Sequence, residues 1–130
     1  MTDSIAARML NPLTLAFIGD GVYELLAREH IVACHGSLSP GKLHALCVEV
    51  VRASAQASAF SRIEGLLDEE ELTIFRRGRN AGGVTVPKSS STADYRCATG
   101  LEALFGYLHL CGRSERTRAL FAEIIQEATI

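Results

Sequence analysis

Two carboxylates of this 130-residue chain lie where an ionised side chain is costly. Asp20 lies in the apolar stretch 15–22 and Glu102 in the apolar stretch 98–106, whereas most other acids have polar neighbours. A carboxylate among apolar side chains needs a hydrogen bond, an opposite charge or a metal ion, because moving a bare charge out of water is strongly unfavourable. Asp20 and Glu102 are therefore the first candidates for chemistry.

Glycines in the same stretches predict that the helices carrying these acids pack closely. Four glycines fall inside predicted helices, where each costs about 1 kcal/mol relative to alanine: Gly19, Gly21, Gly100 and Gly106. Close approach of two backbones is the usual reason for such glycines. If the helices cross there, Asp20 and Glu102 converge, and a divalent cation would cancel their repulsion. Mg²⁺, which prefers a few carboxylates plus water, suits such a pair.

The residues alone leave a second interpretation open. Either acid could pair with an arginine instead, and Arg96 is the obvious candidate. Glu24, four residues after Asp20, could extend the acidic face. For Glu24 we favour an exposed pair with Arg28, which follows it at the i,i+4 spacing.

A basic segment lies between residues 76 and 96. It holds one acid, Asp94, and five basic residues, Arg76, Arg77, Arg79, Lys88 and Arg96, so its net charge is +4. The whole chain has a net charge of −2, which leaves −6 for the rest. A local basic segment on an acidic body favours a focused anionic partner. A solvated loop that balances the acids at 68–71 explains the charge equally well.

Composition predicts one globular domain over residues 1–130, with 48% hydrophobic and 22% charged residues. We expect a cytoplasmic protein with no membrane partner, because no stretch is long and apolar enough to span a bilayer and no signal-peptide pattern opens the chain. The four cysteines form no CxxC pair and are expected to be reduced and buried. A zinc site built from Cys34, His35, His44 and Cys47 is disfavoured, because the spacing matches no zinc pattern. The chain has no GxSxG motif and no phosphate loop with its lysine.

Helical periodicity predicts an all-α fold. An asparagine or a serine followed by proline begins two helices, over 12–33 and 40–63, and Gly36 ends the first. Acids at 68–71 predict the first turn of a short helix that stops at Gly78. The glycine-, proline- and serine-rich segment 80–91 predicts a loop. A further helix follows over 92–110, ended by Gly112, and Ser114 begins the last.

The residues around the two acids resemble a known family. Segment 15–24, LAFIGDGVYE, resembles the signature helix of ribonuclease III catalytic domains, and segment 101–108, LEALFGYL, resembles the family's second acidic helix. Segments 75–81, 87–88 and 95–96 resemble the mini-ribonuclease III branch, which has the catalytic domain without the double-stranded-RNA-binding domain. The resemblance runs in order over residues 11–110.

This resemblance implies a dimeric helical bundle of the ribonuclease III type. Such an enzyme hydrolyses double-stranded RNA with Mg²⁺, for which Mn²⁺ can substitute, and leaves 5′-phosphate and 3′-hydroxyl ends. Asp20 and Glu102 match the family's catalytic, metal-binding acids, and Phe17 matches an aromatic residue at the dimer contact. The residues expected to contact RNA are Arg76, Arg77, Arg79, Asn80, Lys88 and Arg96. The branch matures the ends of 23S ribosomal RNA, and a ribosomal protein can present that precursor.

Two positions depart from the full-length enzymes and resemble the mini branch. Ala16 stands where those enzymes carry a glutamate, and Thr99 where they carry an aspartate. Substrate phosphate would then have to complete the shell of two metal ions. One alternative is a non-catalytic RNA-binding or ribosome-associated module of the same fold, against which the intact Asp20 and Glu102 argue. A magnesium-dependent hydrolase of nucleotides is disfavoured, because such enzymes cluster several acids on two helices.

Overall fold

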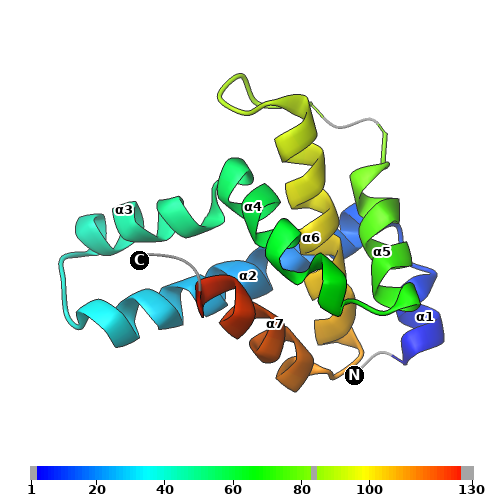
Figure 1. Ribbon diagram of the computed structural model, residues 1–130, viewed down its shortest axis with the longest axis horizontal. Helices are drawn as coiled ribbons and strands as arrows, with labels where there is room; N and C mark the ends of the chain where they lie inside the picture. Colours follow the sequence, from blue (N-terminus) through cyan, green and yellow to red (C-terminus); the bar gives the residue numbers. More distant parts are fainter. Residues whose placement is uncertain (1–2, 83–84, 127–130) are drawn as a thin grey trace.

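The computed structural model describes residues 3–82 and 85–126, which form a bundle of helices (Figure 1). The elements in chain order are α1 (Ser4–Arg8), α2 (Pro12–His35), α3 (Pro40–Val51), α4 (Ala53–Ile63), the 3-10 turn η1 (Glu64–Leu66), α5 (Glu69–Arg79), α6 (Thr92–Leu110) and α7 (Ser114–Gln126). The described residues contain no β-strand, so the all-α prediction is confirmed. The prediction did not include α1 or η1.

Local signals in the sequence begin and end the long helices. The side chain of Asn11 accepts the N–H of Leu13 at the start of α2, and Ser91 accepts the N–H of Asp94 at the start of α6. Gly36 and Gly112, which follow these helices, have φ of 69° and 74°, a conformation that glycine adopts without strain. The helices predicted over 12–33 and 92–110 are confirmed, and α2 is two residues longer than expected.

The single helix predicted over 40–63 is wrong, because the structure breaks it between α3 and α4. Arg52 has an extended backbone, with φ of −62° and ψ of 154°. Three β-branched valines in the preceding four residues weaken the helix there. The guanidinium of Arg52 also pairs with Glu49 at 3.2 Å and donates to Ser54. As a result α3 packs on α2, whereas α4 packs on α6.

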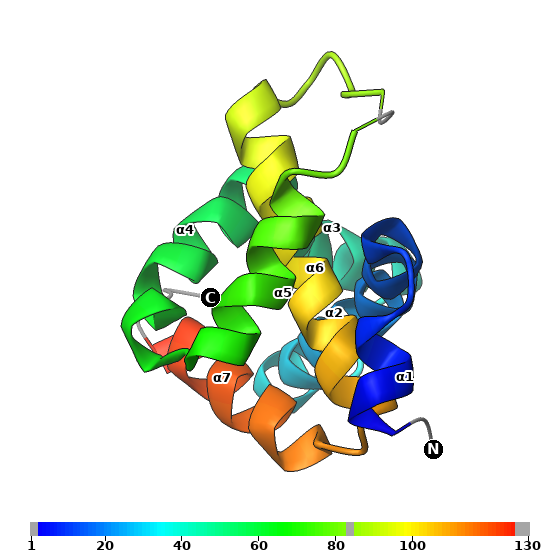
Figure 2. The same cartoon turned by 90° about the vertical axis from the view of Figure 1, so that its right-hand side faces the viewer.

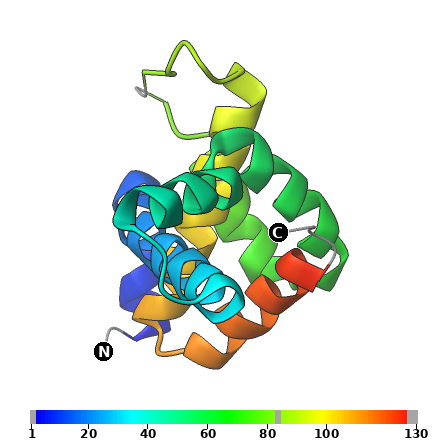
Figure 3. The same cartoon turned by 90° about the vertical axis from the view of Figure 1, so that its left-hand side faces the viewer.

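The central helix of the bundle is α6, which is buried from Ala98 to Leu108 except at Glu102. Helices α2, α4 and α5 pack around it. Figures 2 and 3 view the bundle from opposite sides and show α6 enclosed between these neighbours. The outer ends of α2 and α3 extend beyond the bundle as a hairpin (Figure 1).

A buried ion pair joins α5 to α7. Glu71 accepts hydrogen bonds from Nε and Nη2 of Arg116 at 2.9 and 2.8 Å, and it closes a capping box with Asp68. Burial tends to raise the pKa of Glu71, but the hydrogen bonds from Arg116 and from the Asp68 amide outweigh it, so the pKa lies below its usual value. Glu71 is therefore ionised at neutral pH and holds α7 against the bundle.

Candidate active site

Helices α2 and α6 cross with their backbones in direct contact. A Cβ added at Gly19 would lie 1.6 Å from the carbonyl oxygen of Glu102, and one added at Gly106 would lie 1.9 Å from the carbonyl oxygen of Leu15. A Cβ added at Gly100 would lie 2.7 Å from the carbonyl oxygen of Phe75 in α5. The predicted close approach of the two acid-bearing helices is confirmed at Gly19 and Gly106, whereas Gly100 contacts a different helix, α5. It is wrong for Gly21, around which the space is open.

The crossing brings Asp20 and Glu102 together. The charge of Asp20 acts on Glu102 and raises the pKa of that carboxyl group. Both line an open cavity of about 370 Å³, whose other walls are Leu13, Ala16, Phe17, Tyr95 and Thr99. Asp20 is exposed and Glu102 is partly buried. The two acids thus present their carboxyl groups to one solvent-accessible space.

The surroundings of Glu102 favour its protonated form. Burial, above all, and then the neighbouring Asp20 raise the pKa of Glu102 to about 8, although a hydrogen bond donated by Gln56 acts in the opposite direction. Among the described residues, the side chain that donates a hydrogen bond to Glu102 is Gln56 and not Arg96, the alternative partner considered above. The expected pair of Glu24 with Arg28 is confirmed, at 3.2 Å.

This donor set fits a hard divalent cation. Two adjacent carboxyl groups that repel when ionised and open onto a cavity are the oxygen ligands that Mg²⁺ and Mn²⁺ prefer. Within residues 3–82 and 85–126, no group of three His, Cys, Asp or Glu side chains could hold a metal. Ala16 and Thr99 line the same cavity without supplying a carboxylate. An ion held by Asp20 and Glu102 would therefore take its remaining ligands from water and a bound phosphate.

The cysteines do not provide a competing site. All four are free thiols, as expected. Cys47 is buried, Cys97 and Cys111 are partly buried, and Cys34 is exposed. The expectation of buried cysteines is therefore wrong for Cys34, which lies on the outer end of α2, 3.6 Å from Nε2 of His30.

Basic side chains adjoin the acidic cavity. Tyr95 and Thr99 also line a smaller cavity together with Arg96, Gly78, Ala81 and Val86, so Arg96 lies next to the space that the two acids face. The end of α5, the loop and the start of α6 lie together at one end of the bundle (Figure 1). Arg76, Arg79, Asn80 and Lys88 are exposed in this region. Arg79 donates to Oδ1 of Asn80, and its guanidinium lies 5.6 Å from the centre of the Phe75 ring.

Arg77 differs from the other basic residues of this segment. Its guanidinium donates to the carbonyl oxygens of Arg8 and Leu10, at 2.7 and 3.0 Å. These two bonds attach α5 to the chain at the end of α1. The structure therefore gives Arg77 a role within the fold.

Sequence reasoning missed Gln56 of α4. This side chain is 3% exposed, and its Nε2 donates to Oε2 of Glu102 at 3.2 Å and to the carbonyl oxygen of Val51 at 2.9 Å. A glutamine in an alanine- and serine-rich helix gives no signal of its own. Only the break at Arg52 and the packing of α4 on α6 bring it against Glu102.

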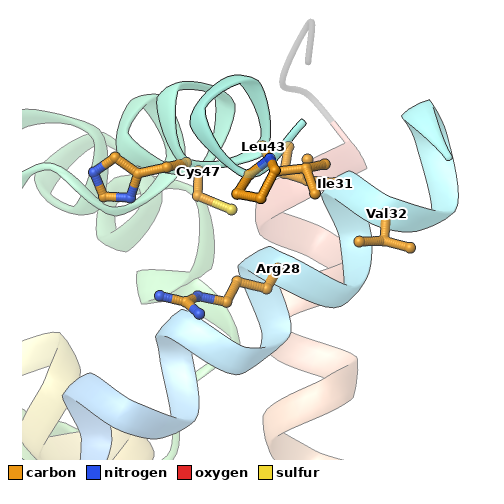
Figure 4. Close-up of a pocket in the computed structure, with 7 residues that line it drawn as sticks. Arg28, Ile31, Val32, Leu43 and Cys47 are labelled. Carbon is orange, nitrogen blue, oxygen red and sulfur yellow. The ribbon is translucent and has the colours of Figure 1, made fainter. Parts of the chain in front are cut away.

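A second cavity lies elsewhere, between the outer halves of α2 and α3 (Figure 4). It measures about 250 Å³ and is lined by Arg28, Ile31, Val32, Pro40, Leu43, His44 and Cys47. The lining is mostly apolar and contains no carboxylate. We therefore place the chemistry at the α2–α6 crossing and not in this pocket.

Comparison with known proteins shows the family to which the chain belongs. The model of the ribonuclease III domain matches residues 13–113, so the chain belongs to the ribonuclease III family, a class of endoribonucleases. The chain is 48% identical to Mini-ribonuclease 3 of a Thermoanaerobacter species over 91% of its length and 84% of that protein. It is 38% identical to Mini-ribonuclease 3 of Streptococcus pneumoniae, over 95% of the chain and 97% of that protein. The resemblance to the mini branch is thereby confirmed.

A solved structure supports the fold. A crystal structure of a protein from Fusobacterium nucleatum matches with a TM-score of 0.83 and 29% identity, over 96% of this chain and 98% of that one.

None of the helices among the described residues is long and apolar enough to span a membrane.

Proposed function

We propose that the protein cleaves double-stranded RNA by Mg²⁺-dependent hydrolysis of phosphodiester bonds, leaving 5′-phosphate and 3′-hydroxyl ends. The observation that carries this proposal is the pair Asp20 and Glu102, held together at a backbone crossing and open to a cavity that adjoins Arg96. Two carboxylates supply the ligands for a divalent cation, and the neighbouring arginine supplies a contact for a phosphate. This combination suits a phosphodiester substrate.

Each residue of the site has a part in this chemistry. Asp20 and Glu102 would hold the cation, which when bound supplies Lewis-acid assistance at the phosphate and lowers the pKa of water. Tyr95 and Thr99 form the wall between the acidic cavity and Arg96. A phosphate bound in the acidic cavity would lie near Arg96. Arg96 would then hold the phosphate by charge, and a cation held by Asp20 and Glu102 would supply a second contact.

The direct test is incubation of a long double-stranded RNA with the purified protein. We expect fragments with 5′-phosphate ends in Mg²⁺ or Mn²⁺ and none in excess chelator. Salt-sensitive binding without cleavage in Mg²⁺ would favour the alternative, a non-catalytic RNA-binding or ribosome-associated module of the same fold. The open pair of acids supports catalysis over that alternative, because a binding module does not need two adjacent carboxylates.

The exposed basic residues are proposed to contact the RNA backbone. The set is Arg76, Arg79, Asn80, Lys88 and Arg96, and Arg77 contributes through the position of α5. A-form RNA is recognised mainly through its phosphates and 2′-hydroxyls across the wide minor groove, which suits cations on an exposed helix end and loop. Such contacts weaken uniformly with salt.

Replacement of Arg79 by alanine tests this interface. Loss of one phosphate contact should lower the slope of log affinity against log salt by about 0.7–0.9. The measurement is RNA binding at several salt concentrations in Ca²⁺ or chelator, so that no cleavage occurs. Arg118→Ala, which removes an exposed arginine of α7, is the control and should leave the slope unchanged. An unchanged slope in Arg79→Ala would show that this arginine does not contact an RNA phosphate.

The protein is also proposed to act as a homodimer. Phe17 is 79% exposed, and Leu25 and Val32 follow it on the same exposed face of α2, at spacings of eight and seven residues. Phe17 also lines the acidic cavity, so a second copy packed on this face would lie beside the site. One copy carries one acidic pair, whereas cutting both strands of a duplex needs two.

Sedimentation at micromolar concentration tests the dimer. We expect the wild-type protein to sediment as a dimer. Phe17→Asp should sediment as a monomer with unchanged helix content, because it places a charge in the apolar contact. A wild-type monomer under these conditions would contradict concerted cleavage of both strands.

For the natural substrate we propose precursor 23S ribosomal RNA, processed in the cytoplasm, with a ribosomal protein able to present it. This assignment is supported by the similarity of the chain to Mini-ribonuclease 3 proteins over 91–95% of its length.

A further inference from the structure

The orientation of the Gln56 amide is fixed by its neighbours. The carbonyl oxygen of Val51 can only accept a hydrogen bond, so the NH₂ group of Gln56 must face it, at 2.9 Å. The second hydrogen on the same nitrogen is directed to Oε2 of Glu102, at 3.2 Å. The amide oxygen then faces the other way. It is buried and has no hydrogen-bond partner in the part of the chain that the structure describes.

This arrangement costs stability that an apolar side chain would not cost. A buried acceptor without a partner costs about 1–3 kcal/mol. Methionine has nearly the same length and volume and would fill the space without that cost. Packing of α4 against α6 therefore does not explain the amide. What the amide supplies is an N–H donor to one oxygen of the Glu102 carboxylate.

A neutral donor is the type of group that such a position requires. A lysine or arginine at position 56 would cancel the charge of Glu102 and compete with a cation for it. An amide N–H instead holds one oxygen and stabilises the ionised form without adding charge. The break at Arg52 begins α4 at the point where residue 56 reaches both Val51 and Glu102.

We infer that Gln56 is a positioning residue of the proposed cation site, which holds Oε2 of Glu102 and leaves the other oxygen of that carboxylate for the cation. This inference rests on the proposed Mg²⁺-dependent function. It assigns to α4 a part of the site that neither Asp20 nor Glu102 supplies. Residues that orient metal ligands in this way typically change metal affinity or activity by about 10–100-fold when they are replaced.

The test compares Gln56→Met with the wild type in the intact protein. Thermal unfolding is followed over a series of Mg²⁺ concentrations, and the midpoint of the Mg²⁺-dependent rise in Tm is measured. We expect this midpoint to rise about 10–100-fold in Gln56→Met. Cleavage should recover at high Mg²⁺, with an unchanged KM for RNA. Ser58→Ala, at an exposed position of the same helix, should keep the wild-type midpoint.

Gln56→Asn is the second variant, in case methionine disturbs the fold. It keeps the amide but is one methylene too short to reach both Val51 and Glu102, so the midpoint should again rise. A wild-type midpoint in both variants, even with a lower Tm in the absence of Mg²⁺, would show a packing role and overturn the inference alone. A wild-type protein that shows neither a Mg²⁺-dependent shift nor cleavage would overturn the proposed function together with the inference.

Discussion

Asp20→Asn and Glu102→Gln should each lower the rate of double-stranded RNA cleavage at least about a thousandfold. Each change replaces a carboxylate ligand by an amide and removes stabilisation of the reacting phosphate by a bound cation, an effect of several kcal/mol. Neither change touches the exposed basic residues, so RNA affinity in chelator, where no cation links the acids to a phosphate, should stay close to that of the wild type. Single-turnover cleavage and equilibrium binding, measured on the same preparations, separate the two effects.

Glu24→Gln is the matched control for this comparison. Glu24 lies one turn after Asp20 on α2, but its carboxylate pairs with Arg28 at the surface. We expect cleavage close to the wild-type rate, because an exposed i,i+4 pair contributes only a few tenths of a kcal/mol and Glu24 does not line the acidic cavity. Wild-type turnover in Asp20→Asn or Glu102→Gln would refute the assignment of the catalytic acids.

Gly19→Ala should destabilise the protein by more than about 3 kcal/mol. Alanine normally improves a helix by about 1 kcal/mol over glycine. Here the new methyl would lie 1.6 Å from the Glu102 carbonyl oxygen and 2.8 Å from the amide nitrogen of Gly106. Backbone atoms cannot rotate away as a side chain can, so the two helices must separate and lose their packing. Urea unfolding, followed by circular dichroism, measures the loss.

Gly21→Ala provides a control on the same helix with the opposite sign. The space around Gly21 is open. Alanine should therefore stabilise the protein by about 0.4–1 kcal/mol through helix propensity and a less flexible unfolded chain. If Gly19→Ala and Gly21→Ala lowered the free energy of unfolding by similar amounts, the contact at Gly19 would not be what holds the helices together.

Local patterns in the sequence predicted the elements that local energetics determine. The helix starts at Pro12, Pro40 and Thr92 depend on capping side chains next to them in the chain, and each is present in the structure. The convergence of Asp20 and Glu102 could also be inferred. Close contact is the usual reason for a glycine inside a helix, and Gly19 and Gly106, where the contact is found, lie one and four residues from Asp20 and Glu102.

Features that depend on distant residues could not be predicted. Because the chain breaks at Arg52, α3 packs on α2 and α4 packs on α6. This packing places Gln56 against Glu102, which lies 46 residues away in the sequence. Arg77 looks like Arg76 and Arg79 in the sequence, yet its guanidinium is bound by carbonyls near residue 10, 67 and 69 residues distant. The open space at Gly21 likewise depends on where other helices lie, because its neighbours in the sequence are the same kind as those of Gly19.

The contact at the α2–α6 crossing also bears on how the sequence can vary. Main-chain atoms at Gly19, Glu102 and Gly106 set the distance between the two helices, so the placement of both acids does not depend on the volume of any side chain at that point. Core residues farther along α6 can therefore be exchanged during evolution by local repacking while the carboxylates keep their register. The geometry of the two acids therefore depends on main-chain contacts at the crossing, and not on which side chains fill the hydrophobic core.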